Sequence, residues 1–133
     1  MANPTNPYIA FVCAHGAAKS VIAAAYYRSM AEARGQSVRT AAYGVEPDPE
    51  VPAAVIDGLR RDGHDPAART PVAATAEALA SAHLVVVMGC ELPAGICAGP
   101  VVHWEGVPAV SDSYEAARAH IAQRVQELLD RGT

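Results

Sequence analysis

The chain has 133 residues, 51% of them hydrophobic, which suits one compact domain spanning residues 1–133 rather than two. Its formal net charge is −4 and its isoelectric point is about 5.6, and without a run of Lys or Arg this argues against a nucleic-acid surface. The opening residues MANPTNP lack the basic start and apolar stretch of a secretory signal, and no apolar segment approaches the roughly 18 residues of a membrane helix. We therefore expect a soluble, cytoplasmic protein without nucleic-acid or membrane partners.

Strand and helix signals alternate along the chain, which predicts an α/β sheet with crossover helices. The predicted strands cover residues 8–13, 37–43, 83–88 and 101–104. The predicted helices cover residues 19–34, 51–62, 72–82 and 113–131. The run HLVVVM at 83–88 is the most apolar in the chain and is typical of a central parallel strand.

The octet CAHGAAKS, residues 13–20, joins the first predicted strand to the first predicted helix. Its small residues allow backbone N–H groups to turn inward, and the positive end of the following helix points at the same place, so the loop favours an oxyanion. The same field favours the thiolate form of a cysteine at the strand end, here Cys13. The predicted oxyanion-binding residues are Ala14, His15, Gly16, Ala17, Ala18 and Lys19.

Two further side chains of the octet extend this chemistry. Lys19 adds a positive charge six residues after Cys13, and Ser20 adds a hydroxyl that can donate to the Cys13 sulfur or to a leaving group. Together they are the parts of a covalent catalyst for an oxyanion. The alternative is that Cys13 is an inert buried thiol at the end of a strand.

The chain has three cysteines, an odd number that does not suit a closed disulfide framework. Cys90 and Cys97 lie in a segment whose Pro93 and Gly95 would allow it to move. The scattered Cys and His spacings match no zinc pattern, so we expect no metal and no cofactor.

The strand-Cys-x5-basic-Ser-helix start resembles the superfamily of low-molecular-weight protein tyrosine phosphatases and thioredoxin-coupled arsenate reductases. The similarity covers nearly the whole chain: YGVEPDPEVPAAVIDGLRRDGHD is similar to the second strand, turn and helix of that family, and LVVVMGCE to its third strand and following loop. The resemblance implies an α/β three-layer sandwich with a four-stranded parallel sheet, in strand order 2-1-3-4, and helices on both faces.

In the reductase branch of this superfamily, two more cysteines follow the third strand, and Cys90 and Cys97 are placed like that pair. The resemblance implies that Cys13 attacks arsenate and that Cys90 attacks the adduct to release arsenite. Cys97 then resolves the disulfide for reduction by thioredoxin or another thiol reductant. In the phosphatase branch, Cys13 alone would form a phosphocysteine with phosphate or a phosphomonoester.

The chain also departs from the family pattern. Lys19 replaces an Arg that forks to two oxyanion oxygens, and Gly16 replaces an Asn that stiffens the loop. The Asp-Pro pair that carries the general acid is missing, and Asp112 is the nearest candidate, although Ala109 could equally hold the aligned position. Asp112 could instead cap the last helix in a capping box with Glu115.

Three hypotheses follow for this divergent relative. The first, which we prefer, is an enzyme like the arsenate reductases, because every cysteine in the chain falls on a position that the reductase mechanism would use. The second is a phosphomonoesterase. The third is a catalytically weakened module that binds an oxyanion or a partner.

Overall fold

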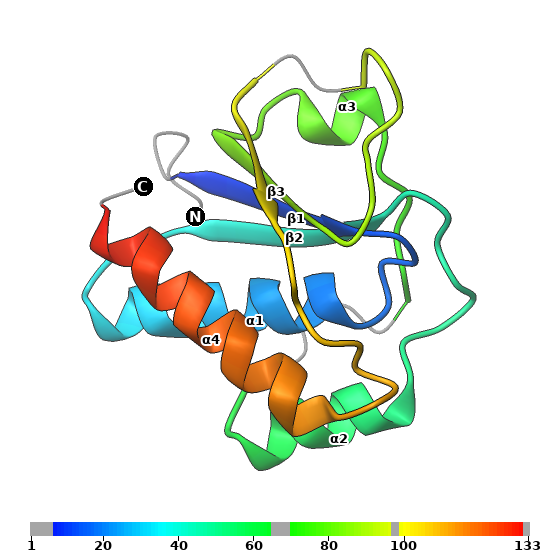
Figure 1. The fold of residues 1–133 in the computed structure, drawn as a ribbon. Coiled ribbons are helices and arrows are strands. Elements are labelled where there is room, and N and C mark those ends of the chain that lie inside the picture. The colour runs from blue at the N-terminus through cyan, green and yellow to red at the C-terminus, as the bar shows by residue number, and fades with distance from the viewer. Residues whose placement is uncertain (1–6, 65–69, 97–98, 132–133) are drawn as a thin grey trace.

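A four-stranded parallel sheet forms the centre of the fold in the computed structural model, which describes residues 7–64, 70–96 and 99–131 (Figure 1). Its strands are β1 (Tyr8–Cys13), β2 (Arg39–Gly44), β3 (Leu84–Met88) and β4 (Val101–Trp104). They lie in the order β2-β1-β3-β4, which confirms the predicted sheet. Cys13 is the register partner of both Gly44 and Met88, so three strands end together beside this cysteine.

The sequence explains which strands are central. Every residue of β1 and β3 is buried, and both are continuous apolar runs, as expected for parallel strands covered on both faces. Most residues of β2 are only partly buried, in keeping with its place at the edge of the sheet.

Helices lie on both faces of the sheet, which confirms the predicted three-layer arrangement (Figure 1). The helices are α1 (Lys19–Ala33), α2 (Ala53–Arg61), α3 (Ala76–Leu79) and α4 (Tyr114–Asp130). In Figure 1, α1, α2 and α4 lie on one side of the sheet and the short α3 lies on the other. Within the described ranges, none of these helices has the length and hydropathy that a membrane crossing requires.

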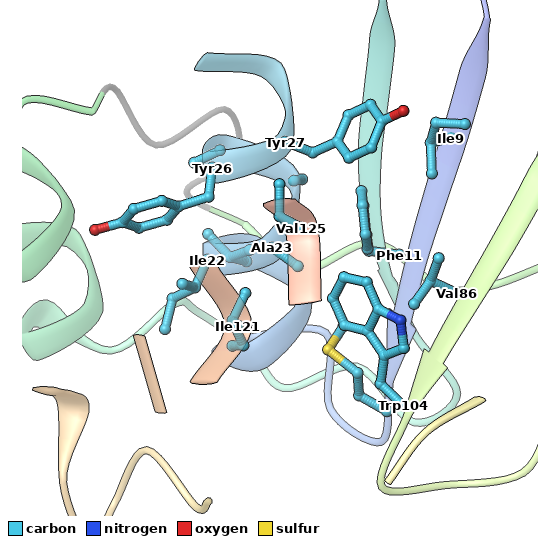
Figure 2. Close-up of a cluster of buried hydrophobic side chains, with 14 of the residues drawn as sticks. Ile9, Phe11, Ile22, Ala23, Tyr26, Tyr27, Val86, Trp104, Ile121 and Val125 are labelled. Carbon is cyan, nitrogen blue, oxygen red and sulfur yellow. The ribbon is translucent and has the colours of Figure 1, made fainter. Parts of the chain in front are cut away.

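The main core fills the space between the sheet, α1 and α4 (Figure 2). Phe11 of β1 is fully buried, and its ring centroid lies 5.8 Å from those of Tyr27 and Trp104. The apolar residues that α4 turns toward this core are all buried: Ala117, Ile121, Val125, Leu128 and Leu129. This packing fixes α1 on the sheet, and with it the segment that joins β1 to α1.

The helix predicted for residues 72–82 is wrong over most of its length, since only Ala76–Leu79 is helical. Gly44 donates its N–H to the Val72 carbonyl over 2.8 Å, and Ala74 donates to the Gly44 carbonyl over 2.8 Å. These bonds hold 72–74 extended beside the end of β2. Thr75 then accepts a hydrogen bond from the Ala78 N–H as the N-cap, so the helix begins only after it.

Candidate active site

The loop of residues 14–18 follows β1 and is held against the segment that follows β2. The carbonyls of Cys13, Ala14 and His15 accept hydrogen bonds from the N–H groups of Val45, Glu46 and Asp48, over 3.1, 2.8 and 3.0 Å respectively. These three bonds join segments about thirty residues apart, which a local sequence pattern does not reveal. The carbonyls are thereby directed toward residues 45–48, while the orientation of the loop amides toward a bound oxyanion stays a prediction.

Gly16 is essential to the shape of this loop. Its φ of +62° lies in the left-handed region that side chains rarely adopt. A Cβ at this position would also lie 2.6 Å from the Gly44 N and 2.9 Å from the Tyr43 carbonyl carbon. The residue that was expected to weaken the loop by replacing Asn is therefore the one that allows its close approach to β2.

Cys13 lies at the carboxyl end of β1 with only 6% of its surface exposed. Its Sγ lies 3.1 Å from the Oγ of the fully buried Ser20, and the thiol donates this hydrogen bond. When the thiol is ionised, the same hydroxyl can donate to the sulfur instead, which is the role predicted for Ser20.

A cavity of about 330 Å³ opens above Cys13. It is lined by Cys13, Ala14, His15, Ala17, Ala18, Lys19, Asp48, Pro52, Ala54, Val55, Met88, Gly89, Ala109, Val110 and Ser111. The predicted loop residues thus surround the cavity, apart from Gly16, which is buried against Gly44. Most of the other walls are apolar.

His15 and Asp48 form a polar pair at this cavity. The His15 Nδ1 lies 3.3 Å from the Glu46 carbonyl oxygen and 3.4 Å from the Asp48 Oδ1. Both oxygens are acceptors, so Nδ1 donates when it carries the proton. Sequence reasoning did not single out Asp48. Its place after the end of a strand next to β1 is the signal that could have found it.

A second cavity, of about 340 Å³, lies beside the first. It is lined by Lys19, Val87, Gly89, Cys90, Glu91, His103, Trp104, Glu105, Gly106 and Val107. Lys19 and Gly89 line both cavities. Cys90 therefore lies next to the first cavity without lining it.

The charges around Cys90 connect it to the first cavity. Burial raises the pKa of the Cys90 thiol, the charge of Cys13 raises it further, and the charge of Lys19 lowers it. The sulfur of Cys90 thus lies within electrostatic range of both side chains. Cys97, the third cysteine of the predicted relay, lies outside the described residues.

Asp112 is exposed and does not line either cavity, whereas the neighbouring Ala109 and Ser111 line the first. The predicted capping role of Asp112 is wrong. The N-cap of α4 is Ser113, whose Oγ accepts a hydrogen bond from the Ala116 N–H over 3.1 Å. A Ser side chain caps a helix as well as Asp does, and sequence alone did not determine which of these adjacent residues takes the position.

Comparison with known proteins finds structural relatives although no protein-family model and no curated protein matches the sequence. The thioredoxin-dependent arsenate reductase of Corynebacterium glutamicum is 25% identical with a TM-score of 0.75, over 95% of this chain and 61% of that one. This chain therefore spans less than two thirds of that protein's length.

Two other solved structures match over nearly their whole length. The arsenate reductase from Archaeoglobus fulgidus is 29% identical with a TM-score of 0.74, over 92% of this chain and 98% of that one. A low-molecular-weight protein tyrosine phosphatase from T. tengcongensis has a TM-score of 0.80, over 95% of this chain and 99% of that one. Its identity of 16% shows a shared fold alone.

Proposed function

We propose that this chain, which belongs to the superfamily of arsenate reductases and low-molecular-weight protein tyrosine phosphatases, is a thiol-dependent enzyme that reduces arsenate. Cys13 is its nucleophile, and Cys90 and Cys97 are its redox relay. The observation that carries the proposal is the placement of Cys13 and Cys90 at the carboxyl ends of adjacent strands, on two cavities that share Lys19.

The first step is the attack of the Cys13 thiolate on arsenic. A sulfur–arsenic bond forms and an arsenic–oxygen bond breaks, and the departing oxygen takes up protons and leaves as water. Lys19 offsets the negative charge of the oxyanion, and Ser20 donates a hydrogen bond to the sulfur before it attacks. The low exposure of Cys13 limits its reaction to molecules that enter the cavity.

The second step reduces arsenic. The Cys90 thiolate attacks the Cys13 sulfur, a disulfide forms, and the sulfur–arsenic bond breaks with its electron pair left on arsenic, which becomes trivalent and leaves as arsenite. The Cys97 thiolate then attacks the Cys90 sulfur and releases Cys13 as a thiolate. A dithiol reductant such as thioredoxin supplies the two electrons that reopen the Cys90–Cys97 disulfide.

One observation favours hydrolysis of a phosphomonoester as a second candidate function. The first cavity has a volume of about 330 Å³ and carries the apolar side chains of Pro52, Val55 and Val110, more space than a bare oxyanion fills. An ester's organic group would occupy the remainder. In this function Cys13 forms a phosphocysteine, water hydrolyses it, and Asp112 is the proposed acid for the leaving group.

Thiol trapping tests the preferred function. The reduced protein is incubated with arsenate, quenched with an alkylating agent, and digested for disulfide mapping by mass spectrometry. We expect arsenate to produce Cys13–Cys90 or Cys90–Cys97 disulfides, and phosphate to produce neither. Cys13→Ser is the matched control, because without the first thiol arsenate should form no disulfide.

The outcomes separate the candidate functions. Arsenate-independent disulfides, or none at all, would contradict the relay. Hydrolysis of an aryl phosphate that persists in the Cys90→Ser and Cys97→Ser variants would then support the phosphatase. Binding of phosphate or arsenate without either reaction would leave an oxyanion-binding module.

A further inference from the structure

Lys19 lies between the two cavities rather than inside one of them. It is the first residue of α1, it is half-buried, and it lines both the Cys13 cavity and the Cys90 cavity. A Cβ placed on Gly89 would lie 3.1 Å from the Lys19 Nζ, so the ammonium group lies directly beside the backbone that leads from β3 to Cys90. Gly89 leaves space for this contact, and its φ of +67° favours glycine there as well.

The charges facing Cys90 make Lys19 its principal cation. Besides Lys19, the charged or titratable side chains that line the second cavity are Glu91, His103 and Glu105. Among the described residues, Lys19 is the one Lys or Arg that lines either cavity. The two carboxylates disfavour a thiolate nearby, so its stabilisation in this cavity depends chiefly on Lys19.

The chemistry of lysine suits a position between two sulfurs. A guanidinium is a rigid fork that matches the oxygens of one bound oxyanion, whereas an ammonium is a compact charge on a flexible stem. The replacement of the family's Arg by Lys therefore weakens the grip on one anion but allows one charge to serve two neighbouring sites.

We propose that the Lys19 ammonium is a counter-ion shared by Cys13 and Cys90, and that it positions and stabilises the Cys90 thiolate for the second step of the relay. This role rests on the proposed arsenate reduction. The Cys90 proton leaves to solvent, the resulting thiolate attacks the Cys13 sulfur, and Lys19 offsets the charge on Cys90 until the disulfide forms. Lys19 acts here as a positioning residue, because it undergoes no bond change itself.

The test measures Cys90 directly in a Cys13→Ser, Cys97→Ser background, where Cys90 is the single thiol. The rate of alkylation by iodoacetamide, a neutral reagent, is followed against pH with and without Lys19→Met. We expect Lys19→Met to slow alkylation near neutral pH roughly three- to tenfold and to move the midpoint of the profile to higher pH. Lys19→Arg should preserve most of the alkylation rate. Added salt should reduce the difference in alkylation rate between the protein that keeps Lys19 and the Lys19→Met variant.

Arg60→Met is the matched control, because it removes one positive charge from an exposed position of α2. It should leave the pH profile of the alkylation rate unchanged within about twofold, because Arg60 lines neither cavity and its exposed charge is screened. Equal rates in the Lys19→Met and control proteins would overturn the proposal. If Lys19→Met fails to fold, Lys19→Gln, with its polar end, replaces it in the same comparison.

The alkylation assay in this background and the arsenate test on the wild-type protein together separate this proposal from the proposed function. If Cys90 alkylation depends on Lys19 but arsenate induces no disulfide in the wild-type protein, the arsenate reductase function fails while the charge coupling stands. If arsenate induces the disulfides and Lys19→Met leaves Cys90 alkylation unchanged, the relay stands and the shared counter-ion is wrong.

Discussion

Cys13 ends β1 and Cys90 follows the neighbouring β3, yet the segments that come after these strands differ in their backbone hydrogen bonds. Three backbone hydrogen bonds join Cys13 and the loop after it to residues 45–48. The Cys13 thiol also forms a hydrogen bond with the buried hydroxyl of Ser20. In the described part of the segment after Cys90, residues 91–96, the Ile96 N–H donates a local backbone hydrogen bond to the Pro93 carbonyl over 3.3 Å. A fixed first nucleophile beside a less constrained second thiol is the arrangement that a relay requires, since the second sulfur has to approach the first.

Replacing each of the two cysteines, Cys13 and Cys90, by serine is the strongest test of the difference between them. We expect Cys13→Ser to lower both arsenate reduction and aryl phosphate hydrolysis by roughly 10⁴-fold or more, because it removes the nucleophile from both reactions. Cys90→Ser should abolish arsenate reduction as completely as Cys13→Ser does. It should leave any aryl phosphate hydrolysis within about twofold of the wild-type rate. Steady-state assays with both substrates make the measurement, and equal loss of hydrolysis in the two variants would contradict the division of roles.

Alanine substitutions of two glycines measure the rigidity of the two segments. Gly16→Ala forces a side chain into backbone at 2.6 Å, so we expect a loss of about 2–4 kcal/mol in the free energy of unfolding. Gly95 also has a positive φ, +78°, but a Cβ there would meet nothing within 4 Å, so Gly95→Ala should cost about 1 kcal/mol from backbone strain alone. Urea unfolding of both variants gives the difference, and similar losses would show that the Cys13 loop is not the more constrained segment.

Ser20→Ala tests the hydrogen bond that distinguishes the environment of Cys13. Ser20 is fully buried with its Oγ 3.1 Å from the sulfur, and its removal takes away a donor worth about 1–1.5 kcal/mol. We therefore expect the alkylation rate of Cys13 near neutral pH to fall about tenfold. Cys90 in the same sample is the internal control, and its rate should change by less than about twofold. An unchanged rate for Cys13 would remove Ser20 from the nucleophile's activation.

The sequence predicted the position of the Cys13 loop because that information is local. A strand, a run of small residues and a helix start occupy one continuous segment, and β1 and α1 begin and end within a residue or two of their predicted positions. The strand order and the covering of both faces followed from the resemblance, and the structure agrees.

What the sequence did not predict depends on contacts between distant segments. The pairing of 72–74 with Gly44 competes with helix formation there, and it becomes visible only once β2 is in place. The same is true of Asp48, which reaches His15 through a loop after another strand. The sharing of Lys19 by two cavities likewise requires β1 and β3 to lie side by side.

The smallest expected effect concerns Asp112, in a third segment outside the comparison. Asp112 is exposed and lines neither cavity, whereas His15 and Asp48 already bring titratable groups to the first. For a reductase that relies on its thiols, Asp112→Asn should change arsenate reduction by less than about twofold and leave stability within about 0.5 kcal/mol.

Ser113→Ala is the neighbouring control for Asp112→Asn, because it removes the N-cap of α4 and should cost about 1 kcal/mol of stability. The decisive measurement for Asp112 is hydrolysis of two aryl phosphates, one with a good and one with a poor leaving group. A loss of about 100-fold or more for the poor leaving group alone would mean that Asp112 donates the proton. That result would shift the function toward the phosphatase, because dependence on the leaving group means that Asp112 protonates the oxygen of an ester.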